Sequence, residues 1–407
     1  MDKKLIKNTI MLYVLNIAKM IFPLLTLPYL TRILSVETYG MIAYVKSVMQ
    51  YMQLTVDFGF MLSGTKDIVE SKENPQKMAI EIGDILIARI LLSVICFGGL
   101  IILGGVIPIL HENFLYTLIS FIPVFLTCFL FDYLFRGIEQ MEIITIRFVI
   151  MKGLSCILTF IMVKGDSNIF WIPVLDILGS ILAIMWVLNS IKKMKIKVAF
   201  SNVRNALNKL QKSAIYFVSN IATTAFTALN TLLIGIYLNA SDVAYWSICT
   251  QIIAAVQMLY SPIIDSIYPK MVKTKNIKFV SRLLCIFMPL IIVGGIITIV
   301  FSKTILWIVG GKQYIDAALI LCALVPILLI SFPTMIFGWP TLGVIGKQKE
   351  VTLSTIVSAI FQFVGLGVLI ILNMFTLINI AVLRCVSEAI MFLIRLKYLM
   401  KNRRLFY

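Results

Sequence analysis

Several basic side chains lie deep inside long apolar runs, where a charge is costly. In the first half of the chain they are Lys19, Lys46 and Arg89. A charge at the centre of a membrane helix costs about 2.5–3.5 kcal/mol, so such groups usually face a cavity or a partner. Lys19 lies too far from either end of its run to reach a headgroup layer easily. Asn16 lies on the same helical stripe, which predicts that these two residues line a cavity.

Acidic groups in the same runs leave two interpretations open. Asp57 and Asp176 are the nearest acids, and they could simply pair with Lys46 and Lys19, or the cations could extend towards the headgroups. In the last run Arg384 and Glu388 lie four residues apart and share a helix face. That spacing fits a structural ion pair. It also fits a carboxylate that binds a coupling proton or sodium ion, a role for which Glu388 and Asp176 are the candidates.

The elements that hold these residues must be membrane helices. The 407 residues are 60% hydrophobic and 14% charged, whereas soluble domains are about 45–50% apolar and about 25% charged. Long runs are apolar on every side, which excludes a β-barrel. The first half predicts helical spans at 8–33, 39–62, 84–108, 114–134, 143–163 and 169–190. The second half predicts them at 213–238, 243–264, 281–301, 316–338, 351–372 and 376–396.

The chain repeats itself at half its length. Val14–Ala18 matches Val218–Ala222 at an offset of about 204 residues, each near the start of the first span of its half. Six spans in each half predict two parallel repeats. We therefore expect an N-terminal lobe over 1–191, a basic cytoplasmic connector over 192–212 and a C-terminal lobe over 213–407.

The distribution of basic residues predicts the orientation. About 28 of the 36 Lys and Arg residues fall in segments on the same side as the N-terminus. Because basic loops stay in the cytoplasm, both termini are expected there. The net charge of +17 needs no nucleic-acid partner, since the positive-inside rule and anionic lipid headgroups explain it.

Enzyme chemistry finds little support in the sequence. The single histidine, His111, lies in a predicted external loop, which excludes a histidine-based metal or nucleophile site inside the spans. The seven cysteines are odd in number and lie in apolar runs, so neither disulfides nor a zinc site are expected. No catalytic residue, metal or cofactor is predicted, apart from a possible coupling proton or sodium ion.

Five segments, in this order, resemble one family. They are Leu27–Gly40, Asp57–Phe60 with Gly64–Lys66, Leu134–Met141, Ser261–Pro262 with Tyr268–Met271, and Gly343–Lys347. Together they resemble the bacterial polysaccharide transporters, the O-antigen and capsule flippases of the multidrug/oligosaccharidyl-lipid/polysaccharide exporter superfamily. Two departures stand out: Ser35 replaces an expected glycine, and Thr250–Gln251 stand where the family often has a Glu-Lys pair.

The resemblance implies an all-α integral membrane fold with about twelve helices in two six-helix bundles around a central V-shaped cavity. It further implies a flippase of the bacterial plasma membrane. This flippase would move undecaprenyl-diphosphate-linked oligosaccharides by ion-coupled alternating access, beside a polysaccharide polymerase and glycosyltransferases. The diphosphate would bind the cavity cations Lys19, Lys46, Arg89 and Arg384, with Asn16 as a lining residue.

Other functions fit the sequence less well. An ion-coupled exporter of amphipathic cations would need an acidic cavity, which the deep cations argue against. A glycan polymerase or ligase would need a large external catalytic loop. A scaffold for glycosyltransferases would need no buried charge at all.

The orientation can be tested with single cysteines. We expect a Lys195→Cys variant to resist a membrane-impermeant maleimide in intact cells, because this residue lies in the predicted cytoplasmic connector. It should react once the cells are permeabilised. Lys164→Cys, in a predicted external loop, is the matched control and should react in intact cells. Labelling of residue 195 from outside would reverse the predicted orientation.

Overall fold

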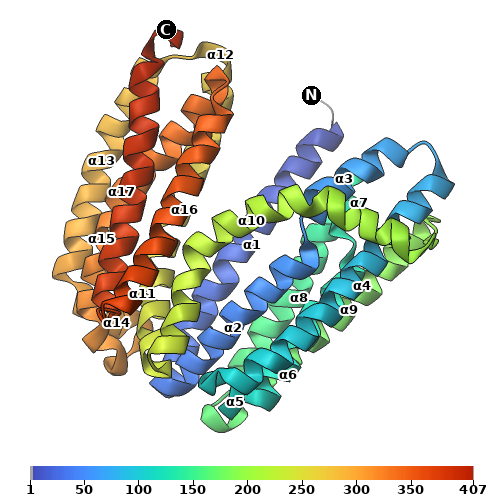
Figure 1. Cartoon of the computed structure of the whole chain (residues 1–407), viewed down its shortest axis with the longest axis horizontal. Helices are drawn as coiled ribbons and strands as arrows, with labels where there is room; N and C mark the ends of the chain where they lie inside the picture. Colours follow the sequence, from blue (N-terminus) through green and yellow to red (C-terminus); the bar gives the residue numbers. More distant parts are fainter. Residues whose placement is uncertain (1–2, 407) are drawn as a thin grey trace. The chain divides into compact units, whose positions relative to one another are not determined.

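The computed structural model describes residues 3–406, and every regular element within that range is a helix. The chain divides into two compact units, Met1–Ile221 and Ala222–Tyr407. Figure 1 shows both units as helical bundles. The predicted lobe boundaries at 191 and 213 stay predictions. The contact-based division falls later, inside one long helix, α10 (Val203–Tyr237).

The first unit also contains the following helices, in chain order. They are α1 (Lys3–Ile33), α2 (Val36–Asp57), α3 (Phe60–Ser71), α4 (Pro75–Val106), α5 (Pro108–Glu112), α6 (Phe114–Leu126), η1 (Thr127–Leu130), α7 (Asp132–Gly137), α8 (Met141–Met162), η2 (Asp166–Asn168) and α9 (Trp171–Lys193). Helix α8 packs against both α1 and α9 (Figure 1). Helix α4 packs against α2, α3 and α6. These two packed groups position the polar side chains described below.

The second unit continues with a similar series. Its helices are α11 (Ala240–Met258), α12 (Ser261–Thr274), α13 (Ile277–Val300), α14 (Ser302–Gly310), η3 (Lys312–Ala317), α15 (Ala318–Ile336), the π-helical turn η4 (Phe337–Leu342), η5 (Gly343–Ile345), α16 (Gln348–Ile371), α17 (Leu377–Lys401) and η6 (Arg403–Leu405). Helix α17 packs between α15 and α16 (Figure 1).

Each of the twelve predicted spans falls on helical structure. Among the described residues, nine helical segments are long and apolar enough to cross a membrane. The remaining three predicted spans coincide with α2, α10 and α11. The shortest of these has 19 residues. At 1.5 Å per residue it extends about 28 Å, close to the thickness of a bilayer core of about 30 Å.

Equivalent helices in the two halves begin with capped N-termini. Ser35 caps α2 by accepting a hydrogen bond from the backbone N–H of Thr38. Asn239 caps α11 in the same way, and Asp242 completes a capping box there. Such caps satisfy backbone donors that helix ends leave free. The second span of each predicted repeat therefore starts at a defined residue.

Three predicted spans are broken helices in the structure, and the span 243–264 breaks between α11 and α12. The span 39–62 is interrupted at Phe58 and Gly59, whose φ angles of 40° and 78° are both left-handed. The span 114–134 is interrupted at Phe131, with a φ angle of 49°. A left-handed residue cannot continue a right-handed helix. Hydropathy does not register such breaks, because the residues on both sides of them are still apolar.

The segment after α9 is held tightly against the first unit. The backbone N–H of Ala199 donates to the carbonyl of Ala79 over 3.0 Å, and the Ser201 hydroxyl donates to Asp84 over 2.7 Å. Lys209 then bonds to both Asp67 and Glu81. Burial alone would lower the pKa of Lys209, but its hydrogen bonds and attraction to these two carboxylates outweigh burial and raise that pKa. Lys209 therefore stays charged and anchors the start of α10 on the first unit.

Gly83 makes the close approach of this segment to α4 possible. A Cβ atom at Gly83 would lie 2.0 Å from the carbonyl oxygen of Ala199. We expect Gly83→Ala to lower the free energy of unfolding by about 1–3 kcal/mol, because the backbone must shift. Gly98→Ala, on the same helix with nothing within 4 Å of the new Cβ, is the control and should be neutral or stabilising. Equilibrium unfolding in detergent measures both, and equal effects would contradict the close approach.

Candidate functional site

A group of charged side chains lies within the helices of the first unit. The Lys152 ammonium on α8 lies 2.8 Å from the Asp176 carboxylate on α9. The Ser155 hydroxyl donates to the same carboxylate oxygen over 2.9 Å. Lys46 on α2 lies within electrostatic range of both Asp176 and Lys152. Three helices thus direct charge towards one region.

Helix α1 brings a third lysine to this level. The Thr145 hydroxyl donates to the carbonyl of Met11, and the Tyr29 hydroxyl donates to the carbonyl of Val163. Both bonds join residues 134 apart, which places Lys19 beside the turn of α8 that holds Lys152. The Lys19 ammonium accordingly lies 5.8 Å from the centre of the Phe148 ring, within the range of a cation–π contact.

The group carries more positive than negative charge. It contains three lysines, Lys19, Lys46 and Lys152, and one carboxylate, that of Asp176, which gives a formal net charge of +2. In the described part of the chain neither Lys19 nor Lys46 takes part in an ion pair. Both side chains are exposed, as is Asn16, and the Lys152 side chain is 38% exposed. We refer to Lys19, Lys46, Lys152 and Asp176 together as the lysine group. The cations of this group are accessible to an anion.

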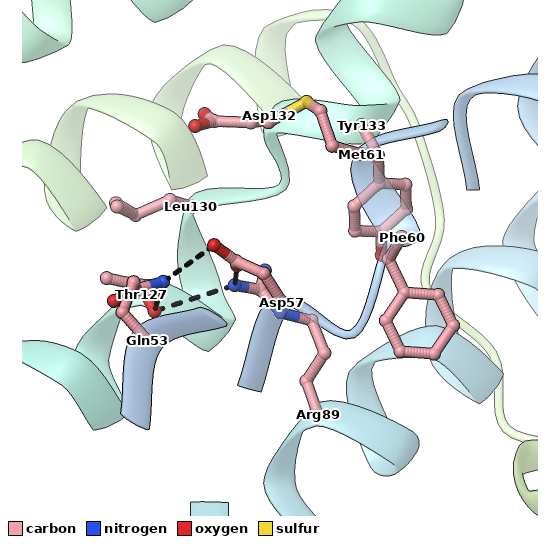
Figure 2. Close-up of a pocket in the computed structure, with 9 residues that line it drawn as sticks. All are labelled: Gln53, Asp57, Phe60, Met61, Arg89, Thr127, Leu130, Asp132 and Tyr133. Carbon is pink, nitrogen blue, oxygen red and sulfur yellow. Dashed lines mark hydrogen bonds and ion pairs between the residues drawn. The ribbon is translucent and has the colours of Figure 1, made fainter. Parts of the chain in front are cut away.

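Arg89 belongs to a different cluster, beside the helix breaks. Its guanidinium donates to Asp57 over 2.6 Å. The Gln53 amide donates to the same carboxylate and to the Thr127 hydroxyl, each over 3.0 Å. These groups line a pocket of about 90 Å³ (Figure 2). Asp132 also lines this pocket and pairs with the buried Arg147.

The structure corrects the predicted ion pairs. Asp57 pairs with Arg89 and not with Lys46, because positions 46 and 57 lie eleven residues apart on α2. This separation corresponds to about 16 Å along a helix. Asp176 pairs with Lys152 and not with Lys19, because α8 lies against both α1 and α9 and brings its own lysine to the acid.

Lys152 was not among the site residues predicted from the sequence. It lies in the middle of the predicted span 143–163, at a depth from which the headgroups are hard to reach. The depth argument that selects Lys19 applies equally to Lys152, so the signal was present in the sequence. The assignment of Lys19, Lys46, Arg89 and Asn16 to substrate binding stays a prediction.

The second unit contains one local ion pair deep in α17. Arg384 donates to Glu388 over 2.9 Å on α17, and the two side chains are 12% and 5% exposed. A buried chain of neutral groups lies beside them: Ser387 donates to Gln362, and Gln362 donates to Asn230. The shared helix face predicted for Arg384 and Glu388 is confirmed. Their predicted roles in substrate and ion binding stay predictions.

A further arginine in the second unit holds a break in a helix. Arg395 is buried and donates to the carbonyl of Thr334 over 2.7 Å, as well as to the Ser354 and Thr355 hydroxyls. Gly338, in the π-helical turn, has non-helical backbone angles. A Cβ there would lie 2.8 Å from the Arg395 guanidinium. Arg395 therefore joins the last turn of α15, beside the break, to α16.

Thr250 and Gln251, which replace the charged pair of the family, each form a hydrogen bond within their own helix. The Thr250 hydroxyl donates to the carbonyl of Trp246, and the Gln251 amide donates to the Ser247 hydroxyl. Both bonds lie within α11. These two positions therefore contribute no charge to the second unit.

Comparisons with known proteins agree with this architecture. Residues 5–275 match the family described as polysaccharide biosynthesis protein. A candidate O-antigen transporter of Shigella dysenteriae is 26% identical over 369 residues, which cover 87% of this chain and 90% of the relative.

Two solved structures share the fold. The lipid II flippase MurJ has a TM-score of 0.72 at 16% identity, covering 97% of this chain and 87% of that one. A multidrug resistance MATE family transporter has a TM-score of 0.69 at 13% identity, covering 97% and 99%.

The fold is therefore that of the two-lobed, twelve-helix membrane transporters, and the protein is a multi-pass membrane protein. Because the family match covers more than half of the sequence, the chain belongs to the polysaccharide biosynthesis protein family. The central cavity that the resemblance implies depends on how the two units are placed and stays an expectation.

The Arg89–Asp57 pair should matter for stability. The Arg89 side chain is 6% exposed, so Asp57→Asn would leave a buried guanidinium without its carboxylate. Because the Asp57 side chain is 41% exposed beside the pocket, we expect a loss of about 1–3 kcal/mol in the free energy of unfolding, below the range for fully buried pairs. Equilibrium unfolding in detergent measures this loss. Glu73→Gln, at an exposed loop position, is the control, and a loss no larger than the control's would contradict the assignment.

Proposed function

We propose that the protein is a flippase that moves undecaprenyl-diphosphate-linked oligosaccharide repeat units across the bacterial plasma membrane for O-antigen or capsule synthesis. The lysine group is the single observation that carries the proposal. The family and the names of its relatives support it, since they belong to polysaccharide biosynthesis and O-antigen transport.

The chemistry of the substrate explains the need for these lysines. A diphosphate brings about two negative charges into a region of low dielectric, where uncompensated charge is prohibitively costly. The net charge of +2 on the lysine group matches that demand. Lys19 and Lys46 are unpaired with any acid in the described structure and make the first contacts. Asn16, one turn from Lys19, contributes a neutral hydrogen-bonding group.

The two arginines have secondary roles in this proposal, because each already has a carboxylate partner. Arg89 lies nearer the cytoplasmic mouth, where substrate enters, and Arg384 acts from the second lobe. Glu388 and Asp176 are the sites for a coupling proton or sodium ion. The two lobes alternate in opening to each side of the membrane while the lipid tail stays in the bilayer.

The proposal also assigns the surroundings of the protein. Both termini and the basic segment 192–212 lie in the cytoplasm, where the glycosyltransferases make the substrate. A polysaccharide polymerase receives the flipped unit on the other side. A carrier of cationic drugs is disfavoured, because the lysine group repels a cation.

Loss of Lys19 tests the proposal. A strain that lacks the gene, and any redundant flippase, should accumulate lipid-linked repeat units on the cytoplasmic leaflet. Lys19→Ala should fail to restore flipping, although it should fold normally, because removing an unpaired cation makes insertion easier. Lys19→Arg should restore part of the activity, since the charge remains in a wider group. The measurement is surface polysaccharide together with the leaflet position of the lipid-linked unit.

Protein amount must be matched between variants by quantifying the purified membrane fraction. Wild-type transport by Lys19→Ala at matched expression would remove the phosphate-binding role from α1. Normal surface polysaccharide in the deletion strain would overturn the flippase proposal itself.

A further inference from the structure

The lysine of the Lys152–Asp176 pair is more exposed than the arginine of any arginine–carboxylate pair in the described structure. The Lys152 and Asp176 side chains are 38% and 25% exposed, whereas the Arg384 and Glu388 side chains are 12% and 5% exposed. An open pair can exchange partners without first unpacking its helices. Lysine also suits such exchange, because its ammonium is a compact charge on a flexible stem with three rotatable donors.

The groups around Asp176 come from three neighbouring helices. Lys152 and Ser155 on α8 both bond to the carboxylate. Lys46 on α2 and the Tyr116 hydroxyl on α6 lie within electrostatic range of it. Asp176 is thus the acid that offsets the charge of the lysine group when no anion is bound.

The same helix turn connects Lys152 to Lys19. Phe148, which lies under the Lys19 ammonium, precedes Lys152 by four residues on α8 and therefore lies on the same face. An anion bound at Lys19 would lie beside the stem of Lys152. Movement of the Lys152 ammonium away from Asp176 would let both lysines contact that anion.

We propose that Asp176 is an internal counter-ion that competes with the diphosphate of the substrate for Lys152. The inference rests on the proposed function and explains how the site releases its substrate. In the empty site the carboxylate neutralises Lys152. When the diphosphate arrives it takes Lys152, and when it leaves the carboxylate recaptures the lysine. Without this competitor the cations would retain the diphosphate too strongly for rapid release.

The test is a binding measurement on the purified full-length protein in detergent, with farnesyl diphosphate as the probe and farnesol as the control for the tail. Asp176→Asn keeps the shape and an oxygen acceptor for Lys152 and Ser155 but removes the negative charge. We expect it to tighten binding of farnesyl diphosphate about tenfold, and to leave binding of farnesol unchanged.

Three variants separate competition from a structural role. Asp176→Glu retains the negative charge on a longer side chain and should therefore give a much smaller gain in binding than Asp176→Asn. Glu73→Gln removes one exposed negative charge elsewhere and should have no effect on binding. In Lys152→Gln the further change Asp176→Asn should give a much smaller gain, because the competition needs both partners.

The outcomes distinguish this inference from the proposed function. If Asp176→Asn leaves binding unchanged or weakens it, while Lys19→Ala still weakens binding, the inference is wrong and the flippase proposal stands. If the gain persists in full without Lys152, the competition for this lysine is also wrong. If neither the wild type nor any variant binds the diphosphate in preference to farnesol, both are overturned.

Discussion

The cost of placing charge in a low-dielectric environment determines how this protein uses its polar residues. The structure meets that cost in two ways. Some cations are closed into pairs or hydrogen-bond networks, as Arg89 is with Asp57 and Arg384 is with Glu388. Others keep an open surface, as Lys19 and Lys46 do on the first unit. Closed groups hold helices together, whereas open groups remain available to a ligand.

This division follows the chemistry of the two basic side chains. Arginine has a planar fork of five donors, so one buried guanidinium can satisfy several acceptors at once. Arg395 does this at the break after α15, where it bonds to a backbone carbonyl and two hydroxyls. Lysine carries a compact charge on a flexible stem and can change partners more readily. Arginine therefore suits the broken helices, and lysine suits a site that must bind and release an anion.

The sequence predicts the fold better than the site, and the physical reason is clear. The length of an apolar run and the basic residues in a loop can be read from local sequence. Every predicted span therefore falls on helical structure. Ion pairs instead depend on which helices pack together: Asp57 and Arg89 lie 32 residues apart, and Lys152 and Asp176 lie 24 apart. The break at Phe58 could not be predicted either, because the hydropathy of a phenylalanine is the same whether its backbone is helical or left-handed. Lys152, by contrast, could have been found from its depth alone.

The two halves of the internal repeat share a pattern of helices but differ in their deep charged residues. At the offset of 204 residues, Asn16 corresponds to Asn220, whereas Lys19 corresponds to Thr223. The second half thus has no cation at the position where the first half has its deep lysine. Its buried polar groups on α10, α16 and α17 include an ion pair, the hydrogen-bonded Arg395 and a neutral chain through Asn230, Gln362 and Ser387. The deep lysines that are open to a ligand, Lys19 and Lys46, thus lie in the first unit. In the proposed mechanism, a diphosphate that needs about two positive charges therefore finds them on the first unit.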